Sequence, residues 1–155
     1  MELKHILDEI FEDRELMDQA LTTSDYVNNN YPKDKHPGYR YQKGLDTLGD
    51  AVLDICIIQY FFKQGIIDPE SLDKKRQSFG KNEFLKTFAK EHLQLQDTAF
   101  ITDNEKNQLE TQDSKVLATC FEAIVGALFI DKEFEGVEAF LKNIGFYQKI
   151  NKITQ

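Results

Sequence analysis

The chain has 155 residues, 41% of them hydrophobic, and a formal net charge of −8 at pH 7. This length suits a single domain with a substantial hydrophobic core. The three prolines and eight glycines argue against a β-sandwich and against a disordered chain. The negative charge argues against a protein that is held on nucleic acid by charge alone, although bound divalent cations would still allow a nuclease.

The two cysteines, Cys56 and Cys120, both lie inside apolar runs. We expect them to be buried free thiols, which favours a reducing compartment and a cytoplasmic location. The first residues show no basic stretch followed by an apolar core, so no secretory signal peptide is predicted. The longest apolar run, residues 51–62, contains Asp54 and Gln59 and is too short to span a bilayer, so no membrane partner is expected.

The hydrophobic pattern predicts an all-α protein, because apolar residues recur at helical spacing and no segment has a convincing strand pattern. Residues 24–40 are polar and rich in turn-forming residues, so we expect them to form a long loop. Residues 96–112 are also polar and are expected to be irregular. The predicted helices cover residues 2–11, 13–21, 41–63, 71–78, 82–92, 114–131 and 133–142.

The helix predicted over residues 41–63 is apolar nearly all round beyond Asp50. A helix of this kind lies in the centre of a protein or at an interface between subunits. One small domain could not bury residues 51–62 fully, so we expect this segment to form the interface of a homodimer.

Four oxygen-bearing side chains lie on two of the most apolar predicted helices. Asp46 and Asp50 are four residues apart and therefore share one face of the first helix. Thr119 and Glu122 are three residues apart on the second helix and do the same. A carboxylate among apolar residues is costly to desolvate unless something compensates it. If the two helices face each other, these groups converge on an oxygen-rich site suited to Mg²⁺ or Mn²⁺.

Two motifs in the sequence resemble those of the ribonuclease III catalytic domain. Residues 43–53 read Lys-Gly-Leu-Asp-Thr-Leu-Gly-Asp-Ala-Val-Leu, where the family reads roughly Glu-Arg-Leu-Glu-Phe-Leu-Gly-Asp-Ala-Val-Leu. Residues 115–127 read Lys-Val-Leu-Ala-Thr-Cys-Phe-Glu-Ala-Ile-Val-Gly-Ala, where the family reads Lys-x-x-Ala-Asp-x-Phe-Glu-Ala-x-x-Gly-Ala. Both motifs occur in the family's order and separation, and the resemblance covers roughly residues 6–142.

The resemblance implies a ribonuclease III endonuclease-domain helical bundle, in which residues 1–155 form one domain and no double-stranded-RNA-binding domain is present. It also implies a homodimeric endoribonuclease that hydrolyses double-stranded or structured RNA with Mg²⁺ or Mn²⁺ as cofactor. Asp50 and Glu122 are then the expected catalytic residues, and they would bind the metal ion together with Asp46.

Three further residues have expected roles around this cluster. Thr119 is expected either to support the metal ligands through its hydroxyl group or to pack in the helix and bond to the preceding turn. Lys115 is expected to neutralise the carboxylates or to contact phosphate, unless it is a simple exposed lysine. Arg76 falls where the family has an arginine between its two motifs, and it is expected to contact RNA.

Four positions depart from the family's pattern. Lys43 and Asp46 stand where the family has glutamates, and Thr119 stands where it has an aspartate. Thr47 replaces the bulky aromatic residue that the family plugs into its dimer partner. The Mini-III branch of the family is a nuclease with a threonine at the position of Thr119, but it has a non-acidic residue in place of Asp46.

The substitutions at Lys43 and Thr119 leave a second function open. In that alternative the protein is a catalytically silent ribonuclease III-like scaffold that binds RNA or a ribosomal particle. A third alternative is an unrelated all-α metal-binding or interaction protein.

Overall fold

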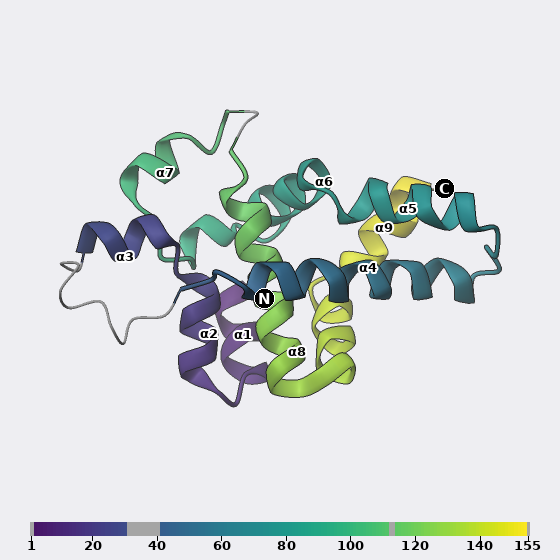
Figure 1. The fold of residues 1–155 in the computed structure, drawn as a ribbon, viewed down its shortest axis with the longest axis horizontal. Coiled ribbons are helices and arrows are strands. Elements are labelled where there is room, and N and C mark those ends of the chain that lie inside the picture. The colour runs from purple at the N-terminus through teal and green to yellow at the C-terminus, as the bar shows by residue number, and fades with distance from the viewer. Residues whose placement is uncertain (1, 31–40, 112–113, 155) are drawn as a thin grey trace.

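The computed structural model describes residues 2–30, 41–111 and 114–154. In this part of the chain the regular elements are helices, and β-structure is limited to one bridge between Thr22 and Phe100 (Figure 1). The predicted all-α class is therefore confirmed. The helices are α1 (Leu3–Ile10), α2 (Arg14–Leu21), α3 (Ser24–Asn30), α4 (Leu45–Lys63), α5 (Pro69–Gly80), α6 (Asn82–Thr87), α7 (Asp103–Asn107), α8 (Val116–Asn143) and α9 (Phe146–Thr154).

Helices α4 and α8 form the most extensive helix–helix contact in the described chain. Their backbones touch because both helices carry a glycine at the crossing. A Cβ atom at Gly49 would lie 1.6 Å from the carbonyl oxygen of Glu122, and one at Gly126 would lie 2.1 Å from that of Leu45. No larger residue fits at either position, so the two glycines set the distance between the helices.

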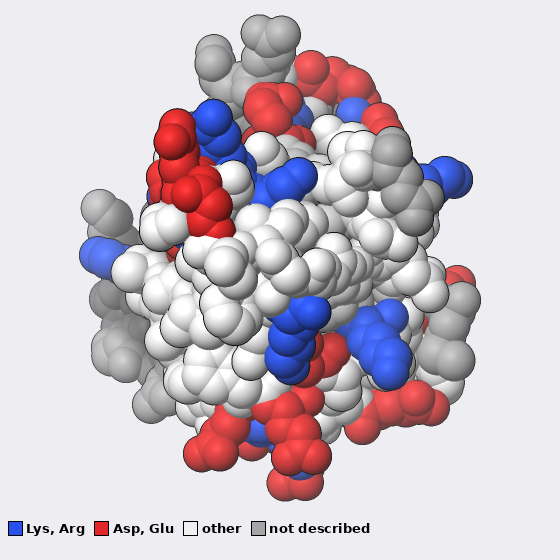
Figure 2. Space-filling model, turned by 90° about the vertical axis from the view of Figure 1, so that its right-hand side faces the viewer, with Lys and Arg blue, Asp and Glu red and all other residues white. Residues whose placement is uncertain are grey.

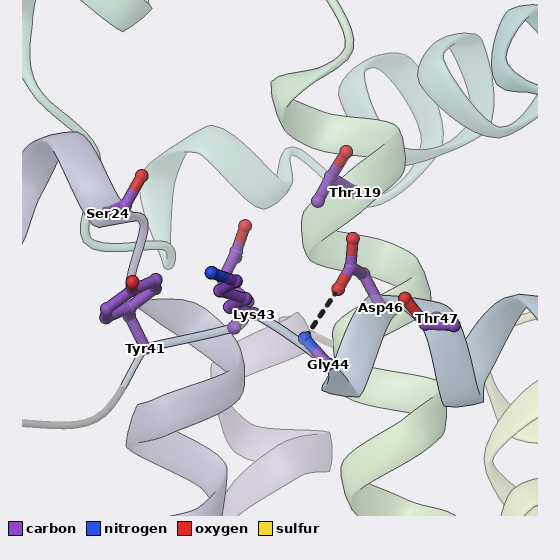
Figure 3. Close-up of a pocket in the computed structure, with 8 residues that line it drawn as sticks. Ser24, Tyr41, Lys43, Gly44, Asp46, Thr47 and Thr119 are labelled. Carbon is purple, nitrogen blue, oxygen red and sulfur yellow. Dashed lines mark hydrogen bonds between the residues drawn. The ribbon is translucent and has the colours of Figure 1, made fainter.

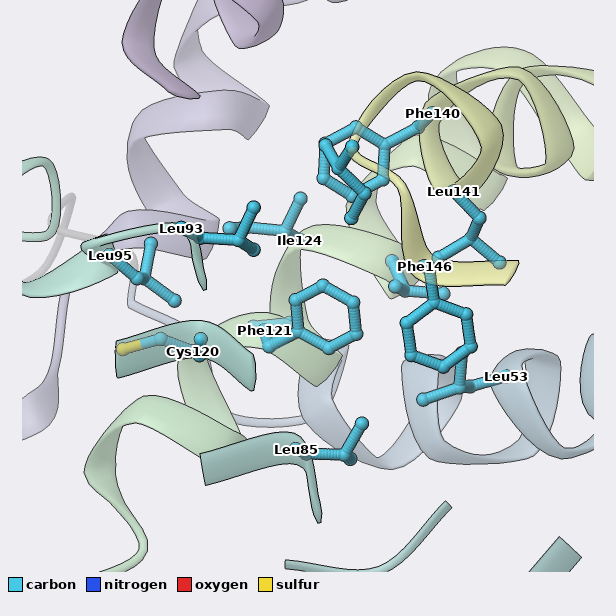
Figure 4. Packing of buried hydrophobic residues seen from close by; sticks show 14 of the residues in the cluster. Leu53, Leu85, Leu93, Leu95, Cys120, Phe121, Ile124, Phe140, Leu141 and Phe146 are labelled. Carbon is cyan, nitrogen blue, oxygen red and sulfur yellow. The ribbon is translucent and has the colours of Figure 1, made fainter. Parts of the chain in front are cut away.

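Aromatic rings fill the interior on another side of α8 (Figure 4). The ring centroid of Phe121 in α8 lies 5.9 Å from that of Phe146 in α9 and 6.0 Å from that of Phe88. All three side chains are buried. Aromatic pairs at these separations stabilise a core beyond the burial of their area. They therefore hold α8 in place where it meets α4.

The predicted long loop is partly helical, since residues 24–30 form α3. The hydroxyl group of Thr23 accepts a hydrogen bond from the backbone N–H of Tyr26 at 3.2 Å and so caps this helix. The run of asparagines, which is typical of turns, concealed that start signal. The rest of the expected loop, residues 31–40, lies outside the described residues. Residues 96–112 were expected to be irregular, but they contain part of a 3₁₀ turn and the short helix α7.

The two helices predicted on either side of residue 132 form one element, α8, which is broken at Glu133. The backbone there has φ 58° and ψ −165°, outside the helical region. Just before the break, the Asp131 carboxylate accepts hydrogen bonds from the backbone N–H groups of Glu12 at 2.9 Å and Asp13 at 3.3 Å. These bonds attach the end of the first half of α8 to the turn between α1 and α2.

Other helix boundaries differ from the prediction by a few residues. Helix α4 begins at Leu45 instead of residue 41, and α5 begins at Pro69, where the side chain of Asp68 caps its first turn. Helix α6 continues into a π-helical turn over Phe88–His92. Helix α9 was not predicted at all, because its apolar pattern extends over little more than two turns.

Candidate active site

The acidic residues predicted to form the site lie on both sides of the contact between α4 and α8. Asp46 and Asp50 come from α4, one turn apart, and Glu122 comes from α8. Because Gly49 lies against the backbone of Glu122, the adjacent Asp50 side chain meets the Glu122 side chain. Thr119 lies one turn before Glu122 and lines a pocket together with Asp46. The structure thus brings these four predicted side chains to one place.

The Glu122 carboxyl group has an altered proton affinity. Burial raises its pKa to about 8, and the hydrogen bond and negative charge of Asp50 and the charges of Asp46 and Asp54 act in the same direction. At neutral pH Glu122 therefore keeps its proton. A cation placed between two such carboxyl groups would displace the proton and relieve their repulsion.

The third expected ligand, Asp46, is oriented differently. Its carboxylate accepts a hydrogen bond from the backbone N–H of Gly44 at 3.1 Å, as the dashed line in Figure 3 shows. Accordingly, no group of three or more His, Cys, Asp or Glu side chains in residues 2–30, 41–111 and 114–154 is arranged to hold a metal ion. The described chain therefore presents a two-carboxyl pair, with the third carboxylate held by the start of its own helix.

The two residues expected to support the cluster differ in their positions. Thr119 is half-buried and lines the pocket together with Asp46. Lys115 is exposed, and the carbonyl group of its backbone accepts the N–H of Thr119 at 2.9 Å. Its side chain is not part of the pocket wall.

Arg76 joins α5 to α4 beside the cluster. Its guanidinium group bonds to Asp73 at 2.6 Å and lies 3.5 Å from the carboxylate of Asp54. Burial and the charge of Asp50 raise the pKa of Asp54, and Arg76 opposes that shift. The sequence did not predict this ion pair, although Asp54 continues the four-residue spacing of the two aspartates before it. The expected contact of Arg76 with RNA stays a prediction.

The pocket beside Asp46 has a volume of about 420 Å³. Figure 3 shows Ser24 and Tyr41 on one side of it and Asp46, Thr47 and Thr119 on the other. The sequence did not indicate Ser24 and Tyr41, because Ser24 begins α3 and Tyr41 lies before α4, and only the tertiary fold brings the two residues to one pocket. No local signal in the chain predicts that arrangement.

One face of α4 is exposed and apolar. Ile55 is 51% exposed and Phe62 is 56% exposed, and Thr47 and Ala51 lie on the same side of the helix. Figure 2 shows a broad uncharged surface, bordered by charged side chains, at the end of the molecule where α4, α5 and α9 lie. The prediction that one domain could not bury this helix fully is therefore confirmed.

The two cysteines are free and buried, as predicted. Burial raises the pKa of Cys56 and of Cys120 to about 12, so both thiols stay protonated. Among the helices of the described residues, none has both the length and the apolar character needed to cross a membrane.

Comparison with known sequences defines the family. The sequence model of the Ribonuclease-III-like family matches residues 13–146, and the chain therefore belongs to this family. Over 143 residues it is 36% identical to ribonuclease 3 of Bacillus cereus strain AH187 and to ribonuclease 3 of Bacillus anthracis strain A0248. These alignments cover 92% of this chain but 56% of each relative, so the chain spans about half the length of the curated relatives it matches.

Solved structures support the same fold. Two structures of the nuclease domain of ribonuclease III from Campylobacter jejuni are similar to this chain, with TM-scores of 0.73 and 0.70. The first is 24% identical and covers 92% of both chains, and the second is 25% identical and covers 93% of this chain and 94% of the other. The first concerns structural flexibility in a region involved in dimer formation of that nuclease domain.

Proposed function

We propose that this protein is a metal-dependent endoribonuclease that hydrolyses phosphodiester bonds in double-stranded or structured RNA. Its membership of the Ribonuclease-III-like family and its similarity to ribonuclease 3 of Bacillus species support an endoribonuclease. The observation that carries the proposal is the carboxyl pair of Asp50 and Glu122 at the crossing of α4 and α8.

Asp50 and Glu122 would hold the divalent cation. Asp46 would add a third oxygen ligand once its carboxylate leaves the backbone N–H of Gly44. These donors are all carboxylate oxygens, which suit Mg²⁺ and Mn²⁺. When bound, such a cation lowers the pKa of water and neutralises charge on the phosphoryl oxygens. Glu122 would lose its proton when it binds the cation, because a carboxylate ligand must be ionised.

The other residues of the site orient the reacting groups. The close contact at Gly49 and Gly126 holds the backbones that carry Asp50 and Glu122 together, which favours a preorganised ligand pair. Thr119 lines the same pocket as Asp46 and places a neutral hydroxyl group beside the ligands. Attack by water in line with the leaving oxygen would give a 5′-phosphate and a 3′-hydroxyl end.

The proposal includes a homodimer, because one site cuts one strand and a duplex has two. The exposed apolar face of α4 supports such an interface. The dimer formation described for the Campylobacter jejuni nuclease domain points to the same arrangement. Thr47 stands where the family has a bulky aromatic residue, so we expect a weaker dimer than is usual in the family.

Activity is tested by cleavage of a long RNA duplex with Mg²⁺ or Mn²⁺ and with EDTA. Wild type should cut only with metal, and Mn²⁺ should act better than Mg²⁺ because Thr119 supplies no charge. Glu122→Gln should abolish cutting while leaving the circular-dichroism spectrum unchanged. Glu135→Gln changes an exposed residue of the same helix and should cut like wild type. Failure of wild type to cut at any metal concentration would overturn the proposal.

Metal binding is tested separately, by thermal unfolding in the presence of Mn²⁺. The ion should raise the unfolding temperature of wild type, because it binds the folded carboxyl pair and not the unfolded chain. The double variant Asp50→Asn/Glu122→Gln should lose this effect. Equal stabilisation of the two proteins would contradict a metal site at this pair.

The silent scaffold is the second candidate function. The observation in its favour is that the described residues contain no ready three-ligand metal group. RNA or ribosome binding by a wild-type protein that never cleaves would establish it. For either function we expect a cytoplasmic location, because both cysteines are free thiols.

A further inference from the structure

The pocket beside the carboxyl cluster is rich in hydrogen-bond donors. Side chains from three separate parts of the chain bring hydroxyl groups to it: Ser24, Tyr41 with Thr47, and Thr119. Lys43 lies between the two sides of the pocket in Figure 3 and adds an ammonium group. The volume of the pocket, about 420 Å³, falls in the range of small-molecule pockets, about 300–1,000 Å³. One ribose with its phosphate fits in such a space.

The segment that carries Lys43 is firmly attached to the core. Gln42 is 6% exposed, and its side-chain amide group donates hydrogen bonds to the carbonyl oxygen of Ala20 and to Sγ of Cys120, each at 3.0 Å. Its backbone N–H donates to the carbonyl of Thr22 at 3.1 Å. Because Gln42 points inward, its neighbour Lys43 is left on the surface.

The charge of Lys43 matters because the surrounding site is acidic. Among the described residues, the lysines in ion pairs are Lys4, Lys74, Lys90 and Lys132, and Lys43 is not one of them. An RNA strand that approaches the carboxyl cluster meets negative charge on a chain with a net charge of −8. An exposed cation on an anchored segment next to that cluster attracts a phosphate group at the point where repulsion is largest.

We infer that this pocket binds one ribose-phosphate unit of the RNA strand next to the phosphodiester that is cut. Lys43 contacts the phosphate group, and the hydroxyl groups of Ser24 and Tyr41 bond to phosphate oxygens and to the ribose 2′-hydroxyl. The inference rests on the proposed function, since it takes an RNA strand as the substrate. Lys43 places a positive charge on the substrate side of the site. The family's motif has a negatively charged glutamate at this position.

The charge is tested by binding of a fluorescein-labelled RNA duplex, longer than one helical turn, in EDTA so that no cleavage occurs. Lys43→Ala should weaken binding equally for duplexes of different sequence, and the slope of log affinity against log salt should fall by about 0.9. Lys43→Glu should weaken binding further, and Lys43→Arg should retain it. Lys149→Ala, an exposed lysine on α9, is the matched control and should bind like wild type.

The hydroxyl groups are tested by comparing RNA and DNA duplexes of one sequence. Tyr41→Phe removes one hydroxyl group and should lower the affinity for RNA by about threefold, with no change for DNA. Equal effects on RNA and DNA would overturn the contact with the 2′-hydroxyl group. Unfolding temperatures equal to that of wild type show that these variants retain the fold.

The outcomes separate the inference from the proposed function. If wild type binds and cuts RNA but Lys43→Ala has the same affinity and salt slope, the inference is wrong and the proposed function stands. If binding depends on Lys43 but no metal supports cleavage, the inference stands and the proposed catalysis is wrong. If wild type binds no RNA, both are wrong.

Discussion

The two faces of α4 have opposite environments. The inward face packs backbone to backbone on α8 and includes Gly49, Val52, Leu53 and Cys56, all buried. The outward face carries exposed apolar side chains, with Ile55 51% exposed. The two faces of α4 therefore have different roles. Its inward face sets the geometry of the carboxyl pair inside one chain, and its outward face is suited to contact between chains.

Gly49→Ala would break the inward face, and we expect it to have the largest effect. The new Cβ atom would overlap the carbonyl oxygen of Glu122, so the helices must separate. We expect a loss of about 3–5 kcal/mol in the free energy of unfolding, measured with urea. Ala51→Val, two residues away on the outward face, is the control and should change the stability of the monomer little. Equal losses would contradict the contrast between the faces.

Ile55→Asp would break the outward face. A charged residue at a two-fold interface is desolvated twice, so the dissociation constant of the dimer should rise by about 100-fold or more. Sedimentation equilibrium over a range of concentrations measures this change, and Gln148→Asp on α9 is a control of the same charge.

Thr47→Phe tests the same face in the opposite direction, since an aromatic residue there should tighten the dimer. A wild-type protein that stays monomeric at tens of micromolar, about the range of modest interfaces, would show that this face binds no second copy.

The carboxyl pair on the inward side predicts a pH dependence of stability without metal. Burial and Asp50 raise the pKa of Glu122 to about 8 from the ordinary value of 4.5. The folded state therefore binds this proton more tightly than the unfolded state. The stabilisation of the folded state by the Glu122 proton is complete below pH 4.5 and absent above pH 8. It declines between these values, because the unfolded chain loses this proton first. Thermal unfolding in EDTA should show this decline in wild type.

Glu122→Gln should flatten that pH profile, because glutamine does not titrate. Glu135→Gln should leave it unchanged. A profile equally steep in the Glu122→Gln variant would mean that another group is responsible.

Arg76→Gln should have the smallest effect. It removes the ion pair with Asp54, which lies on α4 between the inward and the outward face. It leaves Asp54 half-buried beside Asp50 without its cation, so the unfolding temperature should fall. Lys74→Gln removes an exposed ion pair with Glu70 in the same helix and should cost less. Equal shifts for the two variants would show that the pairing with Asp54 contributes nothing particular.

The sequence predicted what depends on local spacing. The three- and four-residue intervals placed Asp46, Asp50, Thr119 and Glu122 on helix faces, and the structure brings those faces together. It did not predict that the carboxylate of Asp46 turns to its own helix start, because that depends on the conformation of the turn before α4.

The remainder of the pocket depends on contacts between residues distant in the chain. The amide group of Gln42 reaches Cys120, a separation that no periodic pattern reports. Helix α3 was missed for a different reason, since its asparagines favour turns in isolation and only the Thr23 cap marks its start.

The link between Asp131 and the turn between α1 and α2 has a consequence for changes in chain length. One added residue turns a helix by about 100°. An insertion between Gly126 and Asp131 would thus set the glycine crossing and the Asp131 link against each other, and one of them would be lost. An insertion just after Glu133 falls where the helix is already broken and leaves both attachments intact. We therefore expect inserted loops and affinity tags to be tolerated just after Glu133 and not between Gly126 and Asp131.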